Sequence, residues 1–281
     1  MRRRLITPIT ALAIGAATLM IAPEAPRAET PAGVAAYAPG WLGFVAEPSK
    51  KDTAGVRVKR VLRRSPASRA ELVPGDLLVA SGDAPLRTSR DLRAASRGLR
   101  PGDPLPLTVE RDGARLELTL TLGARPTQAQ LLSTQLMGLP APAAELTSAR
   151  TGERFTLASL RGKPVVIEFW ATWCAGCKLL SPHLDALARD LGERGHVLAV
   201  TDEKAEVVAT SNPSSHAYHV ARDAGGAVLD DFFVQQLPIV LLIDADGTVR
   251  KAYTGLEHPD AIAKGLRAAL AGALTQPVEG P

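Results

Sequence analysis

The feature that most constrains the fold is a Cys-x-x-Cys motif placed between an apolar run and a leucine-rich segment. Residues 165–170 are apolar except for Glu168, which is typical of a buried strand. Cys174 and Cys177 follow after a short turn. Leucines then recur at helical spacing, at Leu179, Leu180, Leu184, Leu187 and Leu191. We therefore predict a buried strand, a turn and a helix that begins at the cysteine pair.

These two cysteines are the only ones in the chain, and their position predicts redox chemistry. At the N-terminus of a helix, the positive end of the helix dipole and unpaired N–H groups stabilise a thiolate. Cys174 would attack a substrate disulfide, and Cys177, one turn further along, would resolve the mixed disulfide and close a Cys174–Cys177 disulfide. This interpretation requires Cys174 to ionise readily and to be open to solvent.

Two other uses of the cysteines stay open at this stage. A purely structural disulfide across so short a loop removes little entropy from the unfolded chain, so it would stabilise the fold little. A metal site needs further ligands, for which His183, His216 and His219 are candidates, but a tetrahedral set has to converge in space. We favour surface polar roles for His216 and His219, and we predict neither a metal nor a cofactor.

The residues downstream continue a mixed α/β pattern. Residues 196–202 are apolar enough for a second buried strand, and Pro238 stands directly ahead of another apolar strand. An Asp-Gly turn at 246–247 joins that strand to the next one, at 248–253. A helix over about 259–270 closes the domain.

Together these features resemble the thioredoxin superfamily over about residues 138–272. Trp-Cys-x-x-Cys at 173–177, Gly-Lys-Pro at 162–164 and the Leu-Pro pair before an apolar strand are most similar to its TlpA/ResA branch of exported, often membrane-tethered oxidoreductases. The resemblance implies an α/β thioredoxin-like fold, in which helices flank a central mixed sheet. It also implies dithiol/disulfide exchange with protein substrates, with electrons supplied by a membrane thiol transporter.

The resemblance also assigns roles to residues around the cysteines. Pro238 corresponds to a cis-proline facing the disulfide, where the Leu237 backbone pairs with substrate; the alternative is an ordinary trans proline at a strand start. Glu168 corresponds to a buried acid with a raised pKa that accepts the proton of Cys177; the alternative is a salt bridge without proton transfer. Trp173 is expected to pack beside the active site and shield it.

The first part of the chain, residues 38–124, has the pattern of a small, mostly β domain. Thr88 or Ser89 can cap a helix that runs through Leu92. A hairpin turn with Gly113 at positive φ joins the last two strands. Alternating apolar residues predict these strands at 56–61, 105–109 and 116–122.

The order of motifs in this part resembles a PDZ domain of the bacterial, protease-associated type. Gly-Trp-Leu-Gly-Phe at 40–44 opens it, and Ser-Pro-Ala-x-x-Ala-x-Leu-x-Pro-Gly-Asp-Leu-Leu follows at 65–78. In such domains a peptide adds a strand to the sheet edge beside a helix, here the helix with Leu92. Successive backbone N–H groups in a tight turn bind the peptide's terminal carboxylate, and by resemblance this loop consists of Leu42, Gly43 and Phe44. In the alternative, the module packs on its neighbour and binds no free peptide.

The N-terminus has the composition of an export segment. Three arginines precede an uncharged, largely apolar stretch over 5–22. No clean cleavage site follows, so we expect 1–28 to be either a signal peptide or a signal anchor. The remaining segments are linkers at 29–37 and 125–137, a second domain at 138–274 and a tail at 275–281.

Charge and motifs exclude several classes of function. The net charge is +4, with 16 basic and 10 acidic residues in 38–125 and the opposite balance, 13 and 17, in 126–281. This basic excess is too small for a typical nucleic-acid binder, and 4% aromatic residues disfavour a base-stacking surface. Neither His-Glu-x-x-His nor Gly-x-Ser-x-Gly occurs, which disfavours a protease. The basic module either prefers acidic partners or is simply a solvated surface.

We therefore predict an exported or membrane-anchored thiol–disulfide oxidoreductase, periplasmic or on the extracytoplasmic face of the membrane, that acts as a reductant. Its first domain is expected to dock peptide C-termini of substrates or partners. Two alternatives come from other classes. One is a PDZ-based binding or scaffold protein whose second domain is inert. The other is a peroxidase of the peroxiredoxin type, although the reactive cysteine there usually lies in a Thr-containing motif without an adjacent Trp-Cys-x-x-Cys.

Overall fold

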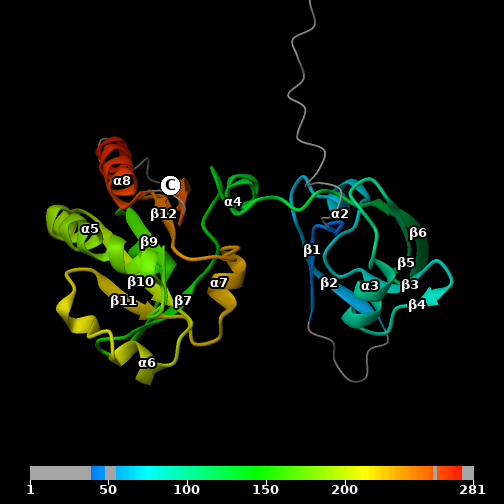
Figure 1. Cartoon of the computed structure of the whole chain (residues 1–281), viewed down its shortest axis with the longest axis horizontal. Helices are drawn as coiled ribbons and strands as arrows, with labels where there is room; N and C mark the ends of the chain where they lie inside the picture. The colour runs from blue at the N-terminus through cyan, green and yellow to red at the C-terminus, as the bar shows by residue number, and fades with distance from the viewer. Residues whose placement is uncertain (1–38, 48–54, 256–257, 274–281) are drawn as a thin grey trace, which may run out of the picture. The chain divides into compact units, whose positions relative to one another are not determined.

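The computed structural model of the chain describes residues 39–47, 55–255 and 258–273 (Figure 1). The predicted signal segment, first linker and C-terminal tail lie outside these ranges. Within these ranges, no helix has both the length and the apolar character needed to cross a bilayer. The described residues form two domains, each built around its own sheet.

The first domain is a six-stranded antiparallel sheet with two short helices, α2 (Pro66–Arg69) and α3 (Ser89–Ala95). The strands lie in the order β1-β2-β3-β5-β6, and β4 pairs with β3. Strand β1 is therefore an edge strand, paired with β2 alone. The bounds are β1 (Phe44–Ala46), β2 (Val56–Val61), β3 (Leu77–Ser81), β4 (Ala84–Pro85), β5 (Pro104–Arg111) and β6 (Ala114–Thr121).

Local sequence explains a hairpin and the start of a helix in the first domain. Asp112 and Gly113 both adopt positive φ, 51° and 82°, as a tight two-residue hairpin between β5 and β6 requires. Helix α3 begins after Thr88, whose side chain accepts a hydrogen bond from the Asp91 N–H while the Asp91 carboxylate accepts one from the Thr88 N–H. The predicted hairpin and helix cap are therefore confirmed.

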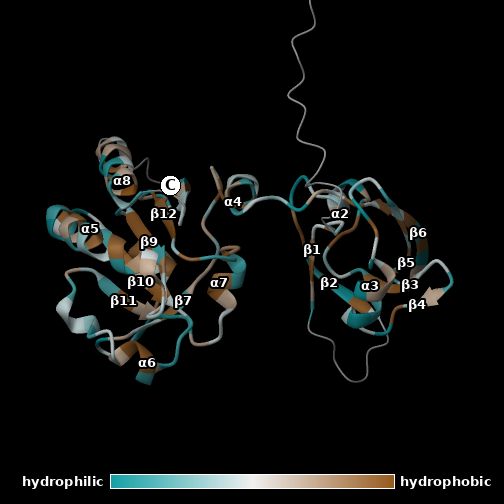
Figure 2. Cartoon of the chain, viewed as in Figure 1, coloured by the Kyte–Doolittle hydropathy of each residue, from teal (hydrophilic) through white to brown (hydrophobic). Residues whose placement is uncertain are grey.

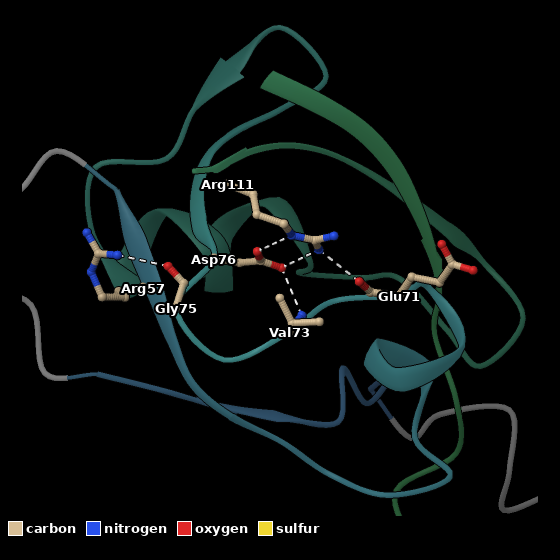
Figure 3. Close-up of polar contacts among 6 residues, drawn as sticks. All are labelled: Arg57, Glu71, Val73, Gly75, Asp76 and Arg111. Carbon is tan, nitrogen blue, oxygen red and sulfur yellow. Dashed lines mark hydrogen bonds and ion pairs between the residues drawn. The ribbon is translucent and has the colours of Figure 1, made fainter. Parts of the chain in front are cut away.

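A buried ion pair fixes the Pro-Gly-Asp turn ahead of β3 (Figure 3). Asp76 is 1% exposed and accepts hydrogen bonds from Arg111 Nε at 2.7 Å and Nη2 at 2.8 Å, and from the Val73 N–H at 2.9 Å. Burial raises the pKa of Asp76, but the bonds from Arg111 and Val73 and the Arg111 charge outweigh it and hold that pKa below its usual value. Arg57 closes the turn from the other side through the Gly75 carbonyl, at 2.8 Å.

The second domain is a seven-stranded mixed sheet in the order β13-β12-β9-β10-β11-β7-β8, flanked by helices (Figure 1). Its strands are β7 (Glu145–Ser148), β8 (Arg154–Thr156), β9 (Val165–Phe169), β10 (His196–Thr201), β11 (His219–Arg222), β12 (Ile239–Ile243) and β13 (Val249–Thr254). Its α-helices are α4 (Gln128–Gln135), α5 (Ala175–Leu191), α6 (Ala205–Ala209), α7 (Ala227–Asp231) and α8 (Pro259–Ala273). Short 3-10 turns lie at η1 (Leu157–Leu160), η2 (Gly192–Arg194) and η3 (Pro213–Ser215).

Strand β9 runs through the middle of this sheet, parallel to β10 and antiparallel to β12, and it is coloured hydrophobic in Figure 2. Its side chains alternate between two cores. Ile167 and Phe169 pack into the core on one face, and Val166 into the core on the other. Helices α5 and α8 cover the face of Val166 with buried leucines. Leu179, which the helical spacing placed with those leucines, is instead 66% exposed. Glu168 points to the same face as Val166 and therefore lies under α5 and α8.

Helix α4 lies within the segment predicted as the second linker, 125–137. Its Leu132 and the following Leu136 are 0% and 2% exposed and belong to the same core cluster as Ile167 and Phe169. The structure therefore places this helix on the sheet of the second domain. The domain boundaries otherwise stay a prediction.

Candidate active site in the second domain

The cysteine pair lies at the start of α5, as the sequence predicted. Cys174 is the residue that precedes the helix, and it forms a disulfide with Cys177, with S–S 2.04 Å and Cα–Cα 5.3 Å. The Cys177 N–H donates to Cys174 Sγ at 3.1 Å. The sulfur of Cys174 therefore sits where unpaired N–H groups and the helix dipole favour negative charge.

The predicted openness of Cys174 to solvent is wrong for this disulfide form. Cys174 is 4% exposed and Cys177 3% exposed, because Trp170 and Leu237 pack against the pair. The predicted shielding by Trp173 is also wrong, since that residue is 72% exposed. The cover therefore comes from Trp170 and from the loop that carries Leu237.

Pro238 stands against the first turn of α5. The Leu237–Pro238 peptide bond is cis, so the predicted isomer is confirmed. A Cβ atom added to Gly176 would lie 3.2 Å from Pro238 Cδ, and one added to Gly255 would lie 2.7 Å from the same atom. A side chain at 255 would therefore clash with this proline, and one at 176 would crowd it. The substrate-pairing role of the Leu237 backbone stays a prediction.

Glu168 is buried without a partner. The residue is 2% exposed, its Oε1 has no hydrogen-bond partner, and among the described residues it forms no ion pair. The alternative of a salt bridge is therefore wrong. Burial raises the pKa of Glu168 to about 8, because no donor offsets the loss of water around the charged form. At neutral pH this carboxyl group is therefore mostly protonated, and its role in proton transfer stays a prediction.

Other polar groups on the same face of the sheet share this environment. Trp170 Nε1 is buried and has no partner either. The Tyr218 hydroxyl shares a hydrogen bond of 2.8 Å with Ser181 Oγ of α5. Burial raises the pKa of Tyr218, and the nearby charge of Glu168 contributes in the same direction. Sequence reasoning missed Tyr218 and Ser181, which no motif connects.

A carboxylate from a neighbouring loop fixes the turn before the cysteines. Glu203 follows β10 and accepts a hydrogen bond from the Thr172 N–H at 2.7 Å and from Thr172 Oγ1 at 2.9 Å. The Glu203 N–H in turn donates to Thr201 Oγ1 at 3.3 Å. Sequence reasoning missed Glu203 as well, because its partner lies 31 positions away.

The histidines have partners other than the cysteines. The His216 ring stacks on the Tyr218 ring at 4.5 Å and its Nδ1 lies 3.3 Å from Asp185, while His183 lies 3.5 Å from Asp260. No group of three His, Cys, Asp or Glu side chains in the part of the chain that the structure describes is placed to hold a metal ion.

In the first domain, the predicted carboxylate loop has free N–H groups. Within the described residues, the carbonyls of Leu42 and Gly43 accept hydrogen bonds from Ala67 and Leu62, whereas the Leu42 and Gly43 N–H groups donate to no other group. Gly43 has φ 84°, and a Cβ there would lie 2.3 Å from Ser65 Cβ, so only glycine fits. The loop continues into Phe44 at the start of β1, and its carboxylate-binding role stays a prediction.

Leu92 does not line a peptide groove. It is 5% exposed and packs in the core of the first domain, because it faces the sheet from α3. Leu92, which was predicted to be part of the helix beside the peptide, therefore turns its side chain to the core, and the exposed residues of this helix and the turn after it include Arg93 and Arg97.

Comparisons with known proteins agree with this geometry. Residues 40–122 match the model of the PDZ domain, and residues 137–252 match that of the AhpC/TSA family. A thiol:disulfide interchange protein, DsbE, from Yersinia pestis is 33% identical over 49% of this chain and 74% of its own length. The chain belongs to the DsbE family of thiol:disulfide interchange proteins.

Two further relatives each match one part of this DsbE-family protein. The thiol-disulfide oxidoreductase ResA of Halalkalibacterium halodurans is 30% identical over 37% of this chain and 61% of its own length. A probable periplasmic serine endoprotease, DegP-like, of Ectopseudomonas mendocina is 35% identical over 34% of this chain and 22% of its own length. The protein is therefore a thiol-disulfide oxidoreductase with a thioredoxin-like α/β domain and a PDZ domain ahead of it.

Proposed function

We propose that this DsbE-family protein reduces disulfides of extracytoplasmic proteins through Cys174 and Cys177, and that its PDZ domain docks the substrate or a partner. The observation that carries the proposal is the disulfide at the start of α5 on the sheet face where Glu168 is buried without a partner. A structural disulfide gains nothing from a helix N-terminus, and an unpartnered buried acid costs stability. Both features fit a pair whose sulfurs change charge during turnover.

In the proposed reaction the reduced protein is the electron donor. The Cys174 thiolate attacks one sulfur of a substrate disulfide, and the other substrate sulfur leaves as a thiolate that takes up a proton. Cys177 then passes its proton to the ionised form of Glu168 and attacks Cys174 Sγ. The second substrate sulfur leaves as a thiolate that takes up a proton, and the Cys174–Cys177 disulfide is restored. A dithiol partner, which the resemblance implies is a membrane thiol transporter, then reduces the disulfide by two electrons.

The surface around the cysteine pair suits a polypeptide substrate. Trp173 and Leu179 are 72% and 66% exposed, and they flank the start of α5. Contiguous exposed apolar patches mark binding surfaces, and we propose that these two side chains form part of one. Because Cys174 itself is only 4% exposed in the disulfide form, a partner has to approach along this apolar rim.

The proposed location follows from the N-terminal pattern and the chemistry together. Three arginines ahead of an apolar stretch predict export, with the segment either cleaved or kept as an anchor. Disulfides form and persist outside the cytoplasm, so a protein that reduces them has its substrates there. A docking domain on the same chain raises the local concentration of a weakly bound substrate disulfide.

The first experiment tests whether Cys174 is the attacking residue. We expect the purified protein to reduce insulin disulfides with dithiothreitol as donor, and Cys174→Ser to lose at least about 100-fold in rate. Ala175→Ser, which adds a hydroxyl at the next, exposed position, is the matched control and should keep the rate. A wild-type disulfide that is inert in this assay would favour a binding or scaffold protein. Peroxide turnover in its place would favour a peroxidase.

The second experiment identifies the substrate. Cys177→Ser removes the resolving thiol, so Cys174 should stay joined to its natural partner in a mixed disulfide that mass spectrometry can identify. Cys174→Ser/Cys177→Ser is the control that should trap nothing. If Cys177→Ser captures no extracytoplasmic protein, the proposed substrate class is wrong.

A further inference from the structure

A buried amide from α4 holds the loop that leads to the cis-proline. Gln128 is the first residue of α4, is 9% exposed, and uses both ends of its side chain. Its Nε2 donates to the Phe233 carbonyl at 2.8 Å, and its Oε1 accepts from the Gln235 N–H at 3.1 Å. The amide thereby pairs with the backbone on both sides of Val234, much as a neighbouring strand would.

The loop needs such a hold because its backbone is strained at Phe233. Helix α7 ends in two backbone hydrogen bonds, from the Phe233 N–H to Asp230 and from the Val234 N–H to Leu229. This ending puts one residue in the left-handed region, where glycine is usual. Here that residue is Phe233, with φ 58°. A bulky side chain persists in this region only where the surrounding contacts fix it.

The loop that is held in this way carries the residue that covers the disulfide. Leu237 follows Gln235 by two positions and packs against Cys174 and Cys177. Over so short a length of chain, fixing the backbone at Gln235 restricts where Leu237 can lie. The amide of Gln128 therefore acts on the disulfide through the loop.

Helix α4 is itself fixed on the second domain. Leu132 and Leu136 are 0% and 2% exposed and lie in a core of that domain. The start of the helix is capped, because the Thr127 side chain accepts from the Gln130 N–H and the Gln130 side chain accepts from the Thr127 N–H. A packed and capped helix presents Gln128 at a fixed point, so the loop adapts to the amide and not the reverse.

We propose that Gln128 is a positioning residue for thiol–disulfide exchange. It holds the loop from Phe233 to Leu237, so that Leu237 covers the disulfide and its backbone stays in place to meet an incoming substrate chain. Gln128 lies between the segments that match the PDZ and AhpC/TSA models, outside the part shared with either family. This role rests on the proposed function and adds a residue on which the engagement of a protein substrate depends.

Removing the two hydrogen bonds should have opposite effects on small and large reaction partners. Methionine has a similar length and no strong donor or acceptor, so Gln128→Met keeps the packing but leaves the Phe233 carbonyl and the Gln235 N–H without this partner. A looser cover admits a small reductant to the disulfide more easily. The same loosening presents a less ordered backbone to a protein substrate, which costs binding.

The first measurement is the rate at which tris(2-carboxyethyl)phosphine reduces the disulfide of the full chain, followed by thiol labelling. We expect Gln128→Met to raise this rate about fivefold, which corresponds to the loss of about one net hydrogen bond. The second measurement uses protein that is reduced in advance and follows a single turnover with insulin. The insulin concentration that gives half the maximal rate should rise about fivefold, while the maximal rate changes little.

Matched variants separate the role of the loop from the stability of the helix. Gln130→Met makes the same change on the same helix at an exposed position, where the amide belongs to the helix cap. It should leave both measurements unchanged. Gln128→Asn keeps a polar amide but is one methylene shorter, so it cannot span both backbone groups and should move both measurements as Gln128→Met does. Thermal melts of each disulfide form show that the variants are folded at the assay temperature.

Unchanged rates in folded Gln128→Met and Gln128→Asn would overturn the proposal. So would slower reduction by the phosphine together with weaker use of insulin, because a general distortion of the site acts in one direction on both partners. A wild type that is inert towards insulin, while Gln128→Met still speeds reduction by the phosphine, would instead contradict the reductase proposal and leave the hold on the cover intact.

Discussion

Asp76 in the PDZ domain and Glu168 in the thioredoxin-like domain are buried to the same degree, at 1% and 2% exposed, but they have opposite surroundings. Asp76 accepts hydrogen bonds from Arg111 and Val73, and its pKa is lowered. Glu168 has an oxygen without a partner, and its pKa is raised to about 8. Burial alone therefore does not decide the charge of a carboxyl group; the donors around it do.

We propose a different role for each group. A carboxylate held by an arginine and an N–H stays charged and fixes the two segments that it joins. A carboxyl group without donors changes protonation near neutral pH at little cost, which suits proton transfer. Four substitutions of carboxyl groups test this distinction.

Asp76→Asn should have the largest effect. It leaves Arg111 without its partner, so we expect the PDZ domain to lose about 3 kcal/mol in free energy of unfolding. Because the folded pKa of Asp76 is lowered, this contribution is present above the usual aspartate pKa and is lost as pH falls through the folded value. Urea unfolding at neutral and acidic pH measures the loss of stability and its dependence on pH. Asp112→Asn, at an exposed position, is the control. Equal unfolding of the wild type and Asp76→Asn at neutral pH would contradict a structural role.

Glu168→Gln should slow insulin reduction by about 10- to 100-fold at neutral pH, because it removes the ionised fraction of Glu168 that accepts the proton of Cys177. In the disulfide form, Glu168→Gln should make the domain more stable than in the wild type, and this difference should grow as the pH rises. The raised pKa makes wild-type stability fall by up to about 1.4 kcal/mol per pH unit between about 4.5 and about 8, since the unfolded chain releases that proton first.

Thermal melts across that pH range, and insulin assays beside them, measure the two effects. Glu206→Gln, at an exposed position, is the control and should change neither. A Glu168→Gln protein whose melting follows the wild-type pH profile would show that Glu168 is already charged in the folded state.

Glu203→Gln is an intermediate case, because Glu203 is half-buried and accepts two hydrogen bonds from Thr172. The amide keeps one acceptor oxygen, so we expect a loss of about 1 kcal/mol in stability. Urea unfolding measures it. A loss of stability as large as that of Asp76→Asn would mean that the number of hydrogen-bond donors affects a carboxylate's contribution to stability more than its exposure does.

Glu110→Gln should have the smallest effect. Its ion pair with Arg115 is 3.3 Å long, and the two side chains are 40% and 71% exposed. Exposed pairs contribute little, so the free energy of unfolding should change by less than about 0.5 kcal/mol. A larger change in urea unfolding would contradict the view that burial and hydrogen-bond donors together determine how much a carboxylate contributes to the stability of this protein.

The sequence predicted what depends on neighbours along the chain. The buried position of Glu168 followed from the apolar residues around it on one strand, and the start of α5 followed from the cysteine pair. The Asp112-Gly113 hairpin and the Thr88 cap are equally local. In each case the signal lies within a few residues, which is the range over which turn chemistry and periodicity act.

The sequence did not predict what depends on distant segments. Arg111 meets Asp76 across 35 positions, and Glu203 meets Thr172 across 31. The predicted solvent exposure of Cys174 was wrong because the loop with Leu237 covers this residue. The predicted shielding by Trp173 was wrong because the same loop leaves Trp173 open to solvent. The role predicted for Leu92 was wrong because helical spacing shows which residues share one face of a helix but not which segment packs against that face.

The disulfide at the start of α5 has a consequence for folding under oxidising conditions. With only two cysteines, the chain has a single intramolecular pairing, so oxidation yields no scrambled isomers within one molecule. Any misoxidised product is a covalent dimer or a mixed adduct, and dilution alone should suppress it.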